Sequence, residues 1–313
     1  MILVVSVNPA VDRTCWLDEL KTGAVNRFSE VKNVAGGKGV NVAKVLAKLY
    51  EAEQNVSNSF DCPGKKVAIT GFAGGATGQF IKEVLHGKGI QCAFVETMAQ
   101  TRVNTNIITK DGSVTELLEP GEVISETEKT QFMERFEELA KKSELVILSG
   151  SLPPGVESDF YAKLIKICHS YHKKVILDSS KGALREGMKA KPDYIKPNEK
   201  ELETLLERSF SKENTEAEIE TAAKMLVGQG IDCVVVSRGE KGIIFVEKNN
   251  EEEFVVVKKR PPKIKPVNTV GCGDSAVAAL AKGLIEQLSQ EKLVEHMIEV
   301  SVKNALSMES GEI

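Results

Sequence analysis

The chain has 313 residues, of which 42% are hydrophobic and 27% charged, which is usual for a folded globular protein and too apolar for a disordered one. Its 41 lysines and arginines against 45 aspartates and glutamates give a net charge of −4, which argues against a general nucleic-acid binder. No apolar run approaches the ~18 residues that cross a bilayer, and the N-terminus lacks the basic region of a signal peptide, so no membrane association is expected.

The six cysteines are scattered along the chain, with no CxxC pair and no cluster of cysteine and histidine. This pattern argues against structural zinc and against a disulfide framework. Free thiols are typical of the reducing cytosol, so we expect a cytoplasmic protein.

Short β-rich runs alternate with longer stretches of helical periodicity. The expected strands are Ile2–Val7, Val67–Phe72, Leu145–Leu148, Val175–Asp178, Tyr194–Lys196, Cys233–Ser237 and Ile243–Val246. The expected helices are Asn41–Tyr50, Thr77–Gly87, Glu126–Lys142, Ser158–Tyr171 and Glu216–Val227. This alternation predicts an α/β fold with a mainly parallel sheet covered on both faces. Ligands of such sheets bind beyond the carboxyl ends of the strands, so the residues that follow each strand are the first candidates.

Two regions interrupt the alternation, Thr14–Val31 and Cys92–Leu118. Both are extended with polar interruptions, and the pair Asp111 and Gly112 is a hairpin signal. Neither has a helix to cover it, so we expect the two to pair into a small separate sheet. A third region, Glu51–Lys65, is polar and predicts a surface loop.

The strongest local signal is the segment Asn268–Ser275, in which an extended run meets two glycines and a helix of small residues. Gly271 and Gly273 let backbone amides turn toward one point, and the positive end of the helix dipole adds to this anion hole. A carboxylate in such a hole, Asp274, suits a hydroxyl that loses its proton while a phosphoryl group arrives. The alternative is an aspartate that caps a helix after a glycine turn.

Two nucleotide-binding motifs are excluded. The spacing of Gly271, Gly273 and Ala276 nearly matches a dinucleotide-binding fingerprint, but no later strand ends in an acidic residue at the required ~20-residue distance. Lys38 is followed by glycine rather than serine or threonine, so there is no Walker A motif.

A second signal is the glycine-rich segment Asn33–Asn41, which enters a helix. Gly36 and Gly37 let a ligand approach the backbone, Lys38 supplies a positive charge, and Asn41 both donates and accepts hydrogen bonds. The loop suits a polyol that carries a phosphate. The alternative is a flexible helix start with a solvated lysine.

A third signal follows the strand at Tyr194–Lys196. Asn198 and Glu201 are three residues apart, so they share one side of a first helical turn. An amide and a carboxylate can hold a hydrated Mg²⁺ near phosphates. The alternative is ordinary helix-start chemistry.

Smaller signals lie at other strand exits and in the two extended regions. Asp12 follows the first strand, where a carboxylate can accept sugar hydroxyls. Arg27 and Arg102 can clamp an anionic substrate, although each alone is more often a surface charge. Ser237–Gly242 suits nucleotide phosphates or forms a hairpin turn, and Ser149–Gly155 is a further strand exit.

Together these motifs, in this order, resemble the PfkB (ribokinase-like) carbohydrate kinases along the whole chain. Gly36–Asn41 is similar to the first signature of the family, and Val270–Asp274 to its second. Asn198 and Glu201 are similar to its magnesium-linked motif.

Three further segments resemble the branch of 1-phosphofructokinases and tagatose-6-phosphate kinases. They are Val7–Asp12, Thr101–Asn104 and Ser149–Gly155. Two features depart from the family: Cys272 stands where alanine or serine is usual, and the segment 51–65 is longer than the usual connection. Only the backbone of Cys272 is needed for the anion hole, so the departure is compatible with activity.

The resemblance implies one kinase domain over residues 1–313, a ribokinase-like three-layer α/β/α sandwich with a mainly parallel central sheet and a small β-sheet lid. The lid is expected from inserted segments at about 12–31 and 92–118. Lids of this family often pair between subunits, so the resemblance admits a homodimer formed through the lid.

The resemblance also implies roles for individual residues. Asp274 is expected as catalytic base, with the backbone of Gly271, Cys272 and Gly273 as anion hole. The expected substrate contacts are Asp12, Arg27, Gly36, Gly37, Lys38, Asn41, Arg102 and Ser149. The expected ATP contacts are Lys196, Asn198, Ser237, Gly239, Gly242 and Asn304, with Asn198 and Glu201 holding Mg²⁺ through water.

The expected activity is transfer of phosphate from MgATP to a ketohexose phosphate, with fructose 1-phosphate giving fructose 1,6-bisphosphate. Tagatose 6-phosphate is the alternative substrate. A free-sugar or nucleoside kinase is disfavoured, because Lys38, Arg27 and Arg102 would then lack an anionic partner. A non-catalytic sugar-phosphate sensor is disfavoured by the complete catalytic motif at Asp274.

Overall fold

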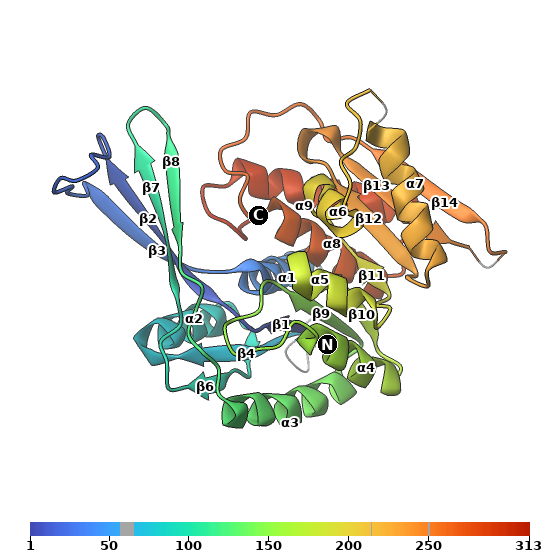
Figure 1. Ribbon diagram of the computed structural model, residues 1–313, viewed down its shortest axis with the longest axis horizontal. Coiled ribbons are helices and arrows are strands. Elements are labelled where there is room, and N and C mark those ends of the chain that lie inside the picture. Colours follow the sequence, from blue (N-terminus) through green and yellow to red (C-terminus); the bar gives the residue numbers. More distant parts are fainter. Residues whose placement is uncertain (57–65, 214, 250) are drawn as a thin grey trace.

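In the computed structural model, which describes residues 1–56, 66–213, 215–249 and 251–313, strands and helices alternate along most of the chain (Figure 1). The strands are β1 (Ile2–Ser6), β2 (Ala10–Leu17), β3 (Glu30–Gly36), β4 (Val67–Gly74), β5 (Gln91–Cys92), β6 (Val95–Thr97), β7 (Val103–Thr109), β8 (Val114–Leu118), β9 (Leu145–Ser149), β10 (Lys174–Asp178), β11 (Tyr194–Ile195), β12 (Cys233–Ser237), β13 (Ile243–Lys248) and β14 (Phe254–Lys259). The helices are α1 (Lys38–Val56), α2 (Gly75–Gly87), α3 (Glu126–Lys142), α4 (Phe160–Ser170), α5 (Lys181–Met188), α6 (Glu199–Leu206), α7 (Thr215–Gly228), α8 (Cys272–Ile285) and α9 (Gln290–Leu306).

A large sheet forms the centre of the molecule. Its strand order is β14-β13-β12-β11-β10-β9-β1-β4-β5, with β6 also paired to β4. All pairs are parallel except β12 with β13 and β13 with β14. Strands β1 and β9 are buried at every position, as continuous apolar runs require when both faces of a sheet are covered. The predicted mainly parallel sheet is confirmed.

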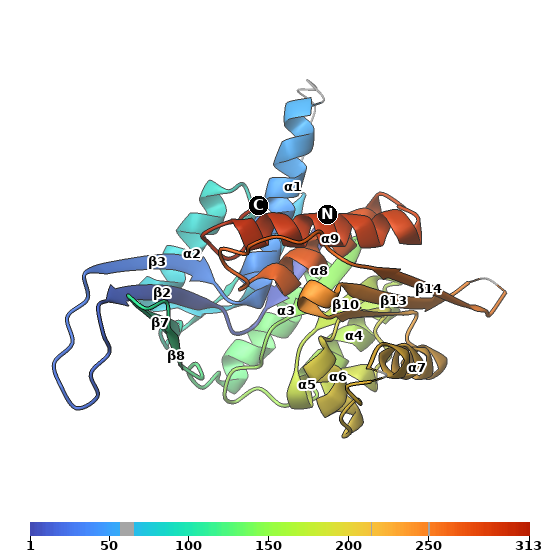
Figure 2. The same ribbon diagram turned by 90° about the horizontal axis from the view of Figure 1, so that it is seen from above.

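Helices cover both faces of this sheet, so the molecule has three layers. Figure 2 shows α1, α2, α8 and α9 on one face and α3 to α7 on the other. Each face of the sheet has its own apolar core, which includes Leu46 on the first face and Phe132 on the second. Helix α8 has four alanines between Ala276 and Ala281, and these small side chains let it pack closely against α1 and α9.

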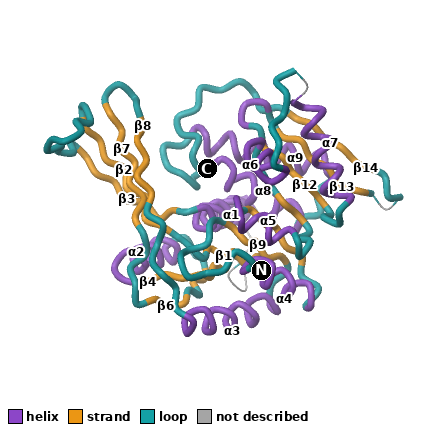
Figure 3. Tube along the Cα trace, viewed as in Figure 1, coloured by secondary structure: helices purple, strands orange, loops and turns teal. Residues whose placement is uncertain are grey.

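A second sheet of four strands, in the order β3-β2-β7-β8, projects from one side of this body and is called the lid here (Figures 1 and 3). Strands β2 and β7 are parallel, and the outer strands are antiparallel to them. The predicted hairpin is present between β7 and β8, where Gly112 has a positive φ of 85°.

The structure corrects several predicted boundaries. Cys92 and Val95–Thr97, predicted in the lid, instead belong to strands β5 and β6, which pair with β4 of the large sheet, so the second lid segment begins at Val103. Glu51, predicted in a loop, continues α1 to Val56, and the rest of that predicted loop, 57–65, lies outside the described residues. Strand β14 and helices α5 and α6 were not among the expected elements. Among the described helices, none is long and apolar enough to span a membrane.

Candidate active site

The predicted site residues meet at the carboxyl edge of the large sheet. Asp178 ends β10, Ser149 ends β9, and Lys196 directly follows β11. The N-terminal turns of α1 and α8 bring Lys38 and Asp274 to the same edge. This is the position at which open parallel sheets bind ligands.

Asp274 lies in the first turn of α8 and is 6% exposed. It accepts a hydrogen bond of 2.9 Å from Asn41 Nδ2, which reaches it from the first turns of α1. Burial, together with the nearby Asp178 charge, raises the pKa of Asp274 from 3.8 to about 6, although Lys38, Asn41 and Lys196 oppose the rise. A carboxylate with this pKa is mostly ionised at neutral pH and yet readily takes up a proton, as a general base must.

Helix α8 begins with Gly271 in the left-handed region, at a φ of 85°. A side chain there would be strained, and its Cβ would lie 3.0 Å from the amide nitrogen of Gly311. The first amides of α8 have no partner within the helix, and the helix dipole makes this end favourable for an anion. The Cys272 side chain faces Asn304, whose Nδ2 donates to its sulfur at 3.5 Å, and burial raises the pKa of the thiol.

Asp178 holds two lysines together and was missed by sequence reasoning. Its oxygens lie 3.7 Å from Lys38 Nζ and 3.3 Å from Lys196 Nζ. Burial opposes its ionisation, but Lys196 and Lys38 outweigh burial and lower the pKa of Asp178. Asp178 in turn raises the pKa of Lys38 far above its ordinary value, so Lys38 remains charged beside Asp274.

Asn198 and Glu201 form a capping box at the start of α6. The Asn198 side chain accepts from the Glu201 amide at 2.8 Å, and Glu201 Oε2 accepts from the Asn198 amide at 2.9 Å. The other oxygen, Oε1 of Glu201, lies 3.6 Å from Lys38 Nζ. The helix-start alternative is therefore observed, and it leaves one carboxylate oxygen directed at the site.

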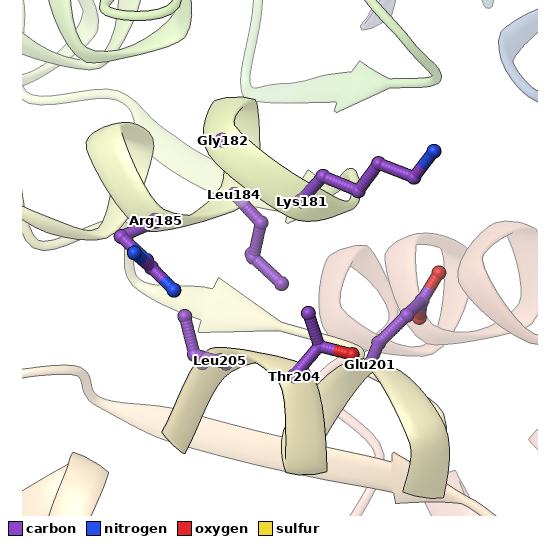
Figure 4. Close-up of a pocket in the computed structure, with 7 residues that line it drawn as sticks. All are labelled: Lys181, Gly182, Leu184, Arg185, Glu201, Thr204 and Leu205. Carbon is purple, nitrogen blue, oxygen red and sulfur yellow. The ribbon is translucent and has the colours of Figure 1, made fainter. Parts of the chain in front are cut away.

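Glu201 also lines a pocket of about 200 Å³ between α5 and α6 (Figure 4). The other lining residues are Lys181, Gly182, Leu184, Arg185, Thr204 and Leu205. Figure 4 shows Leu184 and Leu205 directed into it from the two helices. The pocket contains neither Asp274 nor Asn41 and lies beside the cluster rather than within it.

The lid approaches the site at its base, through Asp12 on β2. Asp12 Oδ1 accepts a hydrogen bond of 2.9 Å from Asn104 Nδ2 on β7, and burial raises the pKa of Asp12. A Cβ on Gly36 would lie 1.9 Å from Asp12 Oδ2, so only glycine fits beside this carboxylate. Arg102 donates to the carbonyl oxygens of Glu119 at 2.8 Å and Asn8 at 3.2 Å.

Gly37 has a φ of 89°, and its Cα faces the backbone of Pro9 and Ala10. The glycines of the first motif thus let α1 begin directly against the end of β1 and the start of β2.

Three predicted contacts have surroundings that differ from the expected ones. Arg27 is exposed in the connection between β2 and β3, at the outer end of the lid away from α8 (Figure 2). Ser149 is 1% exposed, and its hydroxyl lies 3.5 Å from Asp178, so it supports Asp178 rather than facing a substrate. Asn304 is fully buried, and its amide donates to Val270 O at 2.9 Å, so it holds the anion-hole loop instead of facing a nucleotide.

The predicted segment Ser237–Gly242 forms a tight hairpin turn between β12 and β13. Gly239 and Gly242 both have positive φ values, 57° and 94°. A backbone bridge joins Ser237 to Asn198, so this turn lies directly beside the start of α6.

The fold and this cluster define a kinase of small molecules. A buried carboxylate of raised pKa at a helix N-terminus, flanked by charged lysines, is suited to moving a phosphoryl group to a hydroxyl.

Comparison with known proteins gives the family. The sequence profile described as pfkB family carbohydrate kinase matches residues 1–300. The chain belongs to this family, and it is therefore a phosphotransferase that acts on a sugar hydroxyl. Kinases of the family use ATP, generally with a divalent metal ion.

Individual relatives cover nearly the whole chain. A tagatose-6-phosphate kinase of Staphylococcus epidermidis is 35% identical over 315 residues, covering 100% of this chain and 94% of the relative. The structure of phosphofructokinase-2 from Escherichia coli in complex with potassium is 28% identical, with a TM-score of 0.85 over 99% of this chain and 94% of that one. A possible 1-phosphofructokinase of Thermotoga maritima, 23% identical, has a TM-score of 0.81 over 100% of this chain and 94% of that one, a likeness of fold.

Proposed function

We propose that the chain phosphorylates a ketohexose phosphate on its free primary hydroxyl with MgATP, and that fructose 1-phosphate, converted to fructose 1,6-bisphosphate, is its substrate. The observation that carries the proposal is Asp274, a buried carboxylate with a pKa of about 6, hydrogen bonded to Asn41 at the start of α8. A general base of this kind can remove the proton of a hydroxyl and so make its oxygen a nucleophile.

In the proposed mechanism, Asp274 accepts the proton of the sugar hydroxyl as the hydroxyl oxygen attacks the γ-phosphorus of ATP, whose bond to the β,γ-bridging oxygen breaks and releases ADP. The amides of Gly271, Cys272 and Gly273 stabilise the charge on the transferring phosphoryl group. Lys38, held between Asp178 and Glu201, lies beside Asp274 and neutralises further charge at the same point. These groups are fixed before the substrates arrive, so catalysis comes mainly from positioning and electrostatics.

A divalent cation fits the oxygen donors of the site. Oε1 of Glu201 is a hard carboxylate oxygen directed at the site, whereas Oδ1 of Asn198 is engaged in the cap and both oxygens of Asp178 lie beside lysines. Among the described residues, no three of histidine, cysteine, aspartate and glutamate gather closely enough to hold a metal ion. We therefore expect Mg²⁺ to be held through water and phosphate oxygens, and, when bound, to neutralise phosphate charge.

For the sugar, we propose contacts at the base of the lid. Asp12 accepts sugar hydroxyls, Gly36 leaves room for them, and Asn41 lies between the sugar and Asp274. Arg102, just before β7 at the base of the lid, and Lys38 supply positive charge for an anionic substrate. Arg27 contacts the sugar phosphate only if, in the assembled enzyme, the outer end of the lid of one copy reaches the site of another.

For ATP, we propose contacts from Lys196 and Asn198 and from the turn that carries Ser237, Gly239 and Gly242. The bridge between Ser237 and Asn198 supports this assignment, because it joins the two segments at one edge of the site.

Tagatose 6-phosphate is a second candidate substrate. It is favoured by the S. epidermidis relative named tagatose-6-phosphate kinase, which matches the full chain at 35% identity. The two substrates differ in the position of the phosphate and in one hydroxyl configuration, so the same site chemistry serves both.

A coupled assay of ADP release with MgATP tests the proposal. It compares kcat/KM for fructose 1-phosphate, tagatose 6-phosphate, fructose 6-phosphate and free fructose. A lead of tenfold or more for fructose 1-phosphate, about 1.4 kcal/mol in transition-state free energy, supports the first candidate. A lead for tagatose 6-phosphate favours the second, and a lead for free fructose would refute a sugar-phosphate kinase.

The role of Asp274 is tested separately by Asp274→Asn. Loss of a general base costs roughly 10²- to 10⁴-fold in turnover, while substrate binding should persist. A variant that keeps wild-type turnover would remove Asp274 from its proposed role.

We also propose that two copies of the chain pair through their lids. The lid exposes apolar side chains on its strands, including Val31, Val114, Leu117 and Leu118, which are 49 to 63% exposed. Light scattering should give the mass of a dimer, and Leu118→Glu should reduce it to that of a monomer. We expect the enzyme in the cytosol, because Cys15, Cys168, Cys233 and Cys272 form no disulfide bonds.

A further inference from the structure

Lys44 is a buried cation that the proposed chemistry does not use. It lies on α1, three residues after Asn41, and is 3% exposed. Its ammonium donates to two backbone carbonyl oxygens, Ala35 at 3.1 Å and Ser310 at 2.7 Å. Burying a lysine is costly, and burial accordingly lowers its pKa. An apolar side chain would fill this core position at a lower cost in free energy, so the buried lysine suggests a role for its two hydrogen bonds.

The hydrogen bond from Lys44 to the Ala35 carbonyl holds the end of β3, where the glycine-rich motif begins. Ala35 immediately precedes Gly36, where β3 leaves the lid and enters α1. The charge of Lys44 also acts on Asp12 and favours its ionised form. Lys44 thus fixes the strand that lies beside the proposed sugar carboxylate.

The second bond holds the C-terminal segment, Ser307–Ile313. This segment follows α9 and is tied down at several points besides Lys44. Glu309 pairs with Lys32 on the lid strand β3, and Glu312 lies 2.8 Å from Lys88 at the end of α2. The segment therefore bridges the lid and the main body.

Within this segment, Gly311 packs against both catalytic elements. It has a φ of 73°, and a Cβ there would lie 3.0 Å from Asn41 Cα and 2.8 Å from Lys44 Cε. Its amide donates to Asn304 Oδ1 at 2.9 Å, and the same amide nitrogen lies 3.0 Å from the position of a Cβ on Gly271.

The orientation of the Asn41 amide depends on this packing. Its Nδ2 donates to Asp274, but its buried Oδ1 has no hydrogen-bond partner within the described part of the chain. That Oδ1 lies 3.0 Å from the position of a Cβ on Gly311. Contact with Gly311, rather than a second hydrogen bond, keeps the amide turned toward Asp274.

We propose that Lys44 is a positioning residue for phosphoryl transfer: by binding the carbonyls of Ala35 and Ser310, it presses Gly311 against Asn41 and Gly271. It thereby aligns the Asn41 amide with Asp274 and fixes the turn of the anion hole. The inference rests on the proposed role of Asp274 and adds to it a residue that touches neither substrate.

The test compares Lys44→Met with Lys48→Met in the full-length enzyme. Lys48 lies one turn further along α1, where it is exposed and pairs with Glu51 at 3.0 Å, so it is a matched control. Lys44→Met should lower kcat by roughly ten- to a hundredfold, as small displacements of catalytic groups do. Lys48→Met should keep wild-type kcat. Equal kcat for the two variants would overturn the proposal.

A pH profile separates positioning from a general loss of structure. Asp274 is faced by Asp178 on β10, Lys38 and Asn41 on α1, Lys196 after β11 and Cys272 on its own helix. Of these, Lys44→Met should displace Asn41. Since the Asn41 hydrogen bond favours the ionised carboxylate, the acid limb of kcat/KM should move to higher pH. A lower kcat with an unmoved acid limb would overturn the proposal.

Gly311→Ala keeps the test decisive if Lys44→Met does not fold. The new methyl group would press on Asn41 and Lys44 from the surface segment, so the same fall in kcat and the same shift of the acid limb are expected. Wild-type kinetics for a folded Gly311→Ala would refute the proposal. Asp274→Asn, run in parallel, identifies the other failure: if it retains turnover, the proposed function of the base fails and the inference fails with it.

Discussion

Replacing Asp178 with asparagine keeps the shape of the side chain and removes the charge that holds Lys38 and Lys196. The carboxylate is buried and lies 3.3 Å from Lys196 Nζ and 3.7 Å from Lys38 Nζ. With an effective dielectric constant of about 20, each contact is worth about 4–5 kcal/mol before the cost of desolvation. Lys38 is 38% exposed and can be solvated again, whereas Lys196 is 4% exposed and cannot. The net loss of stability should therefore be about 3–5 kcal/mol, the usual cost of breaking a buried ion pair.

The same substitution changes the chemistry in a direction that can be worked out. Asp178 raises the pKa of Asp274, and the two lysines lower it. Removing the Asp178 charge ends the repulsion and leaves both lysines free to act on Asp274, so its pKa should fall below about 6. The acid limb of kcat/KM should move to lower pH, even though the maximal rate falls because Lys38 is no longer held in place.

Urea unfolding and a pH series of the ADP-release assay measure both effects. Asp159→Asn is the control, since Asp159 pairs at the surface with Lys163 at 3.0 Å and should lose less than about 0.5 kcal/mol. An acid limb of Asp178→Asn that stays in place or moves to higher pH would show that Asp178 does not act on Asp274 as described.

Three further predictions follow from the site. In the wild type, kcat/KM should fall about tenfold for each pH unit below about 6, because only ionised Asp274 accepts a proton; a rate that is level down to pH 4.5 would contradict this. The folded state raises the pKa of Asp274 from 3.8 to about 6, so ionisation of Asp274 destabilises the fold as pH rises through that range. Thermal unfolding at pH 8 should therefore find Asp274→Asn more stable than the wild type by up to about 3 kcal/mol. A less stable variant would refute the sign of this effect. Gly36→Ala should raise KM for the sugar phosphate, because its Cβ would lie 1.9 Å from Asp12 Oδ2, whereas Gly87→Ala, with nothing within 4 Å, should leave KM unchanged. Equal KM values for the two alanine variants would separate Gly36 from the sugar site.

The regular elements were predictable because buried strands of a parallel sheet are short continuous apolar runs. Cys233–Ser237 and Glu126–Lys142 have the predicted bounds. Cys92 and Val95–Thr97 were assigned to the wrong sheet, because short strands of two or three residues carry too little pattern to choose a partner.

The site was predictable where a motif has a local physical cause. The glycines around Lys38 and Asp274 let backbone amides turn toward one point, and this effect depends only on residues that are close together in the sequence. Asp178 has no such local signal and was missed. Only its place at the end of a buried strand could have indicated it. The burial of Ser149 and Asn304 depends on elements far away in the chain, so sequence alone suggested ligand contacts that the structure replaces with supporting ones.

The contrast between α8 and the lid has a consequence for amide hydrogen exchange. Helix α8 is buried from Asp274 to Gly283, whereas β8 is exposed at all five positions and pairs on one side only, with β7. Amides of α8 should therefore exchange only in rare large openings, and those of β8 in frequent small ones. Sugar-phosphate binding should slow exchange in the lid and leave α8 as it was. The proposed base is thus carried by a buried helix, whereas the lid beside the proposed sugar site ends in a strand that is exposed at every position.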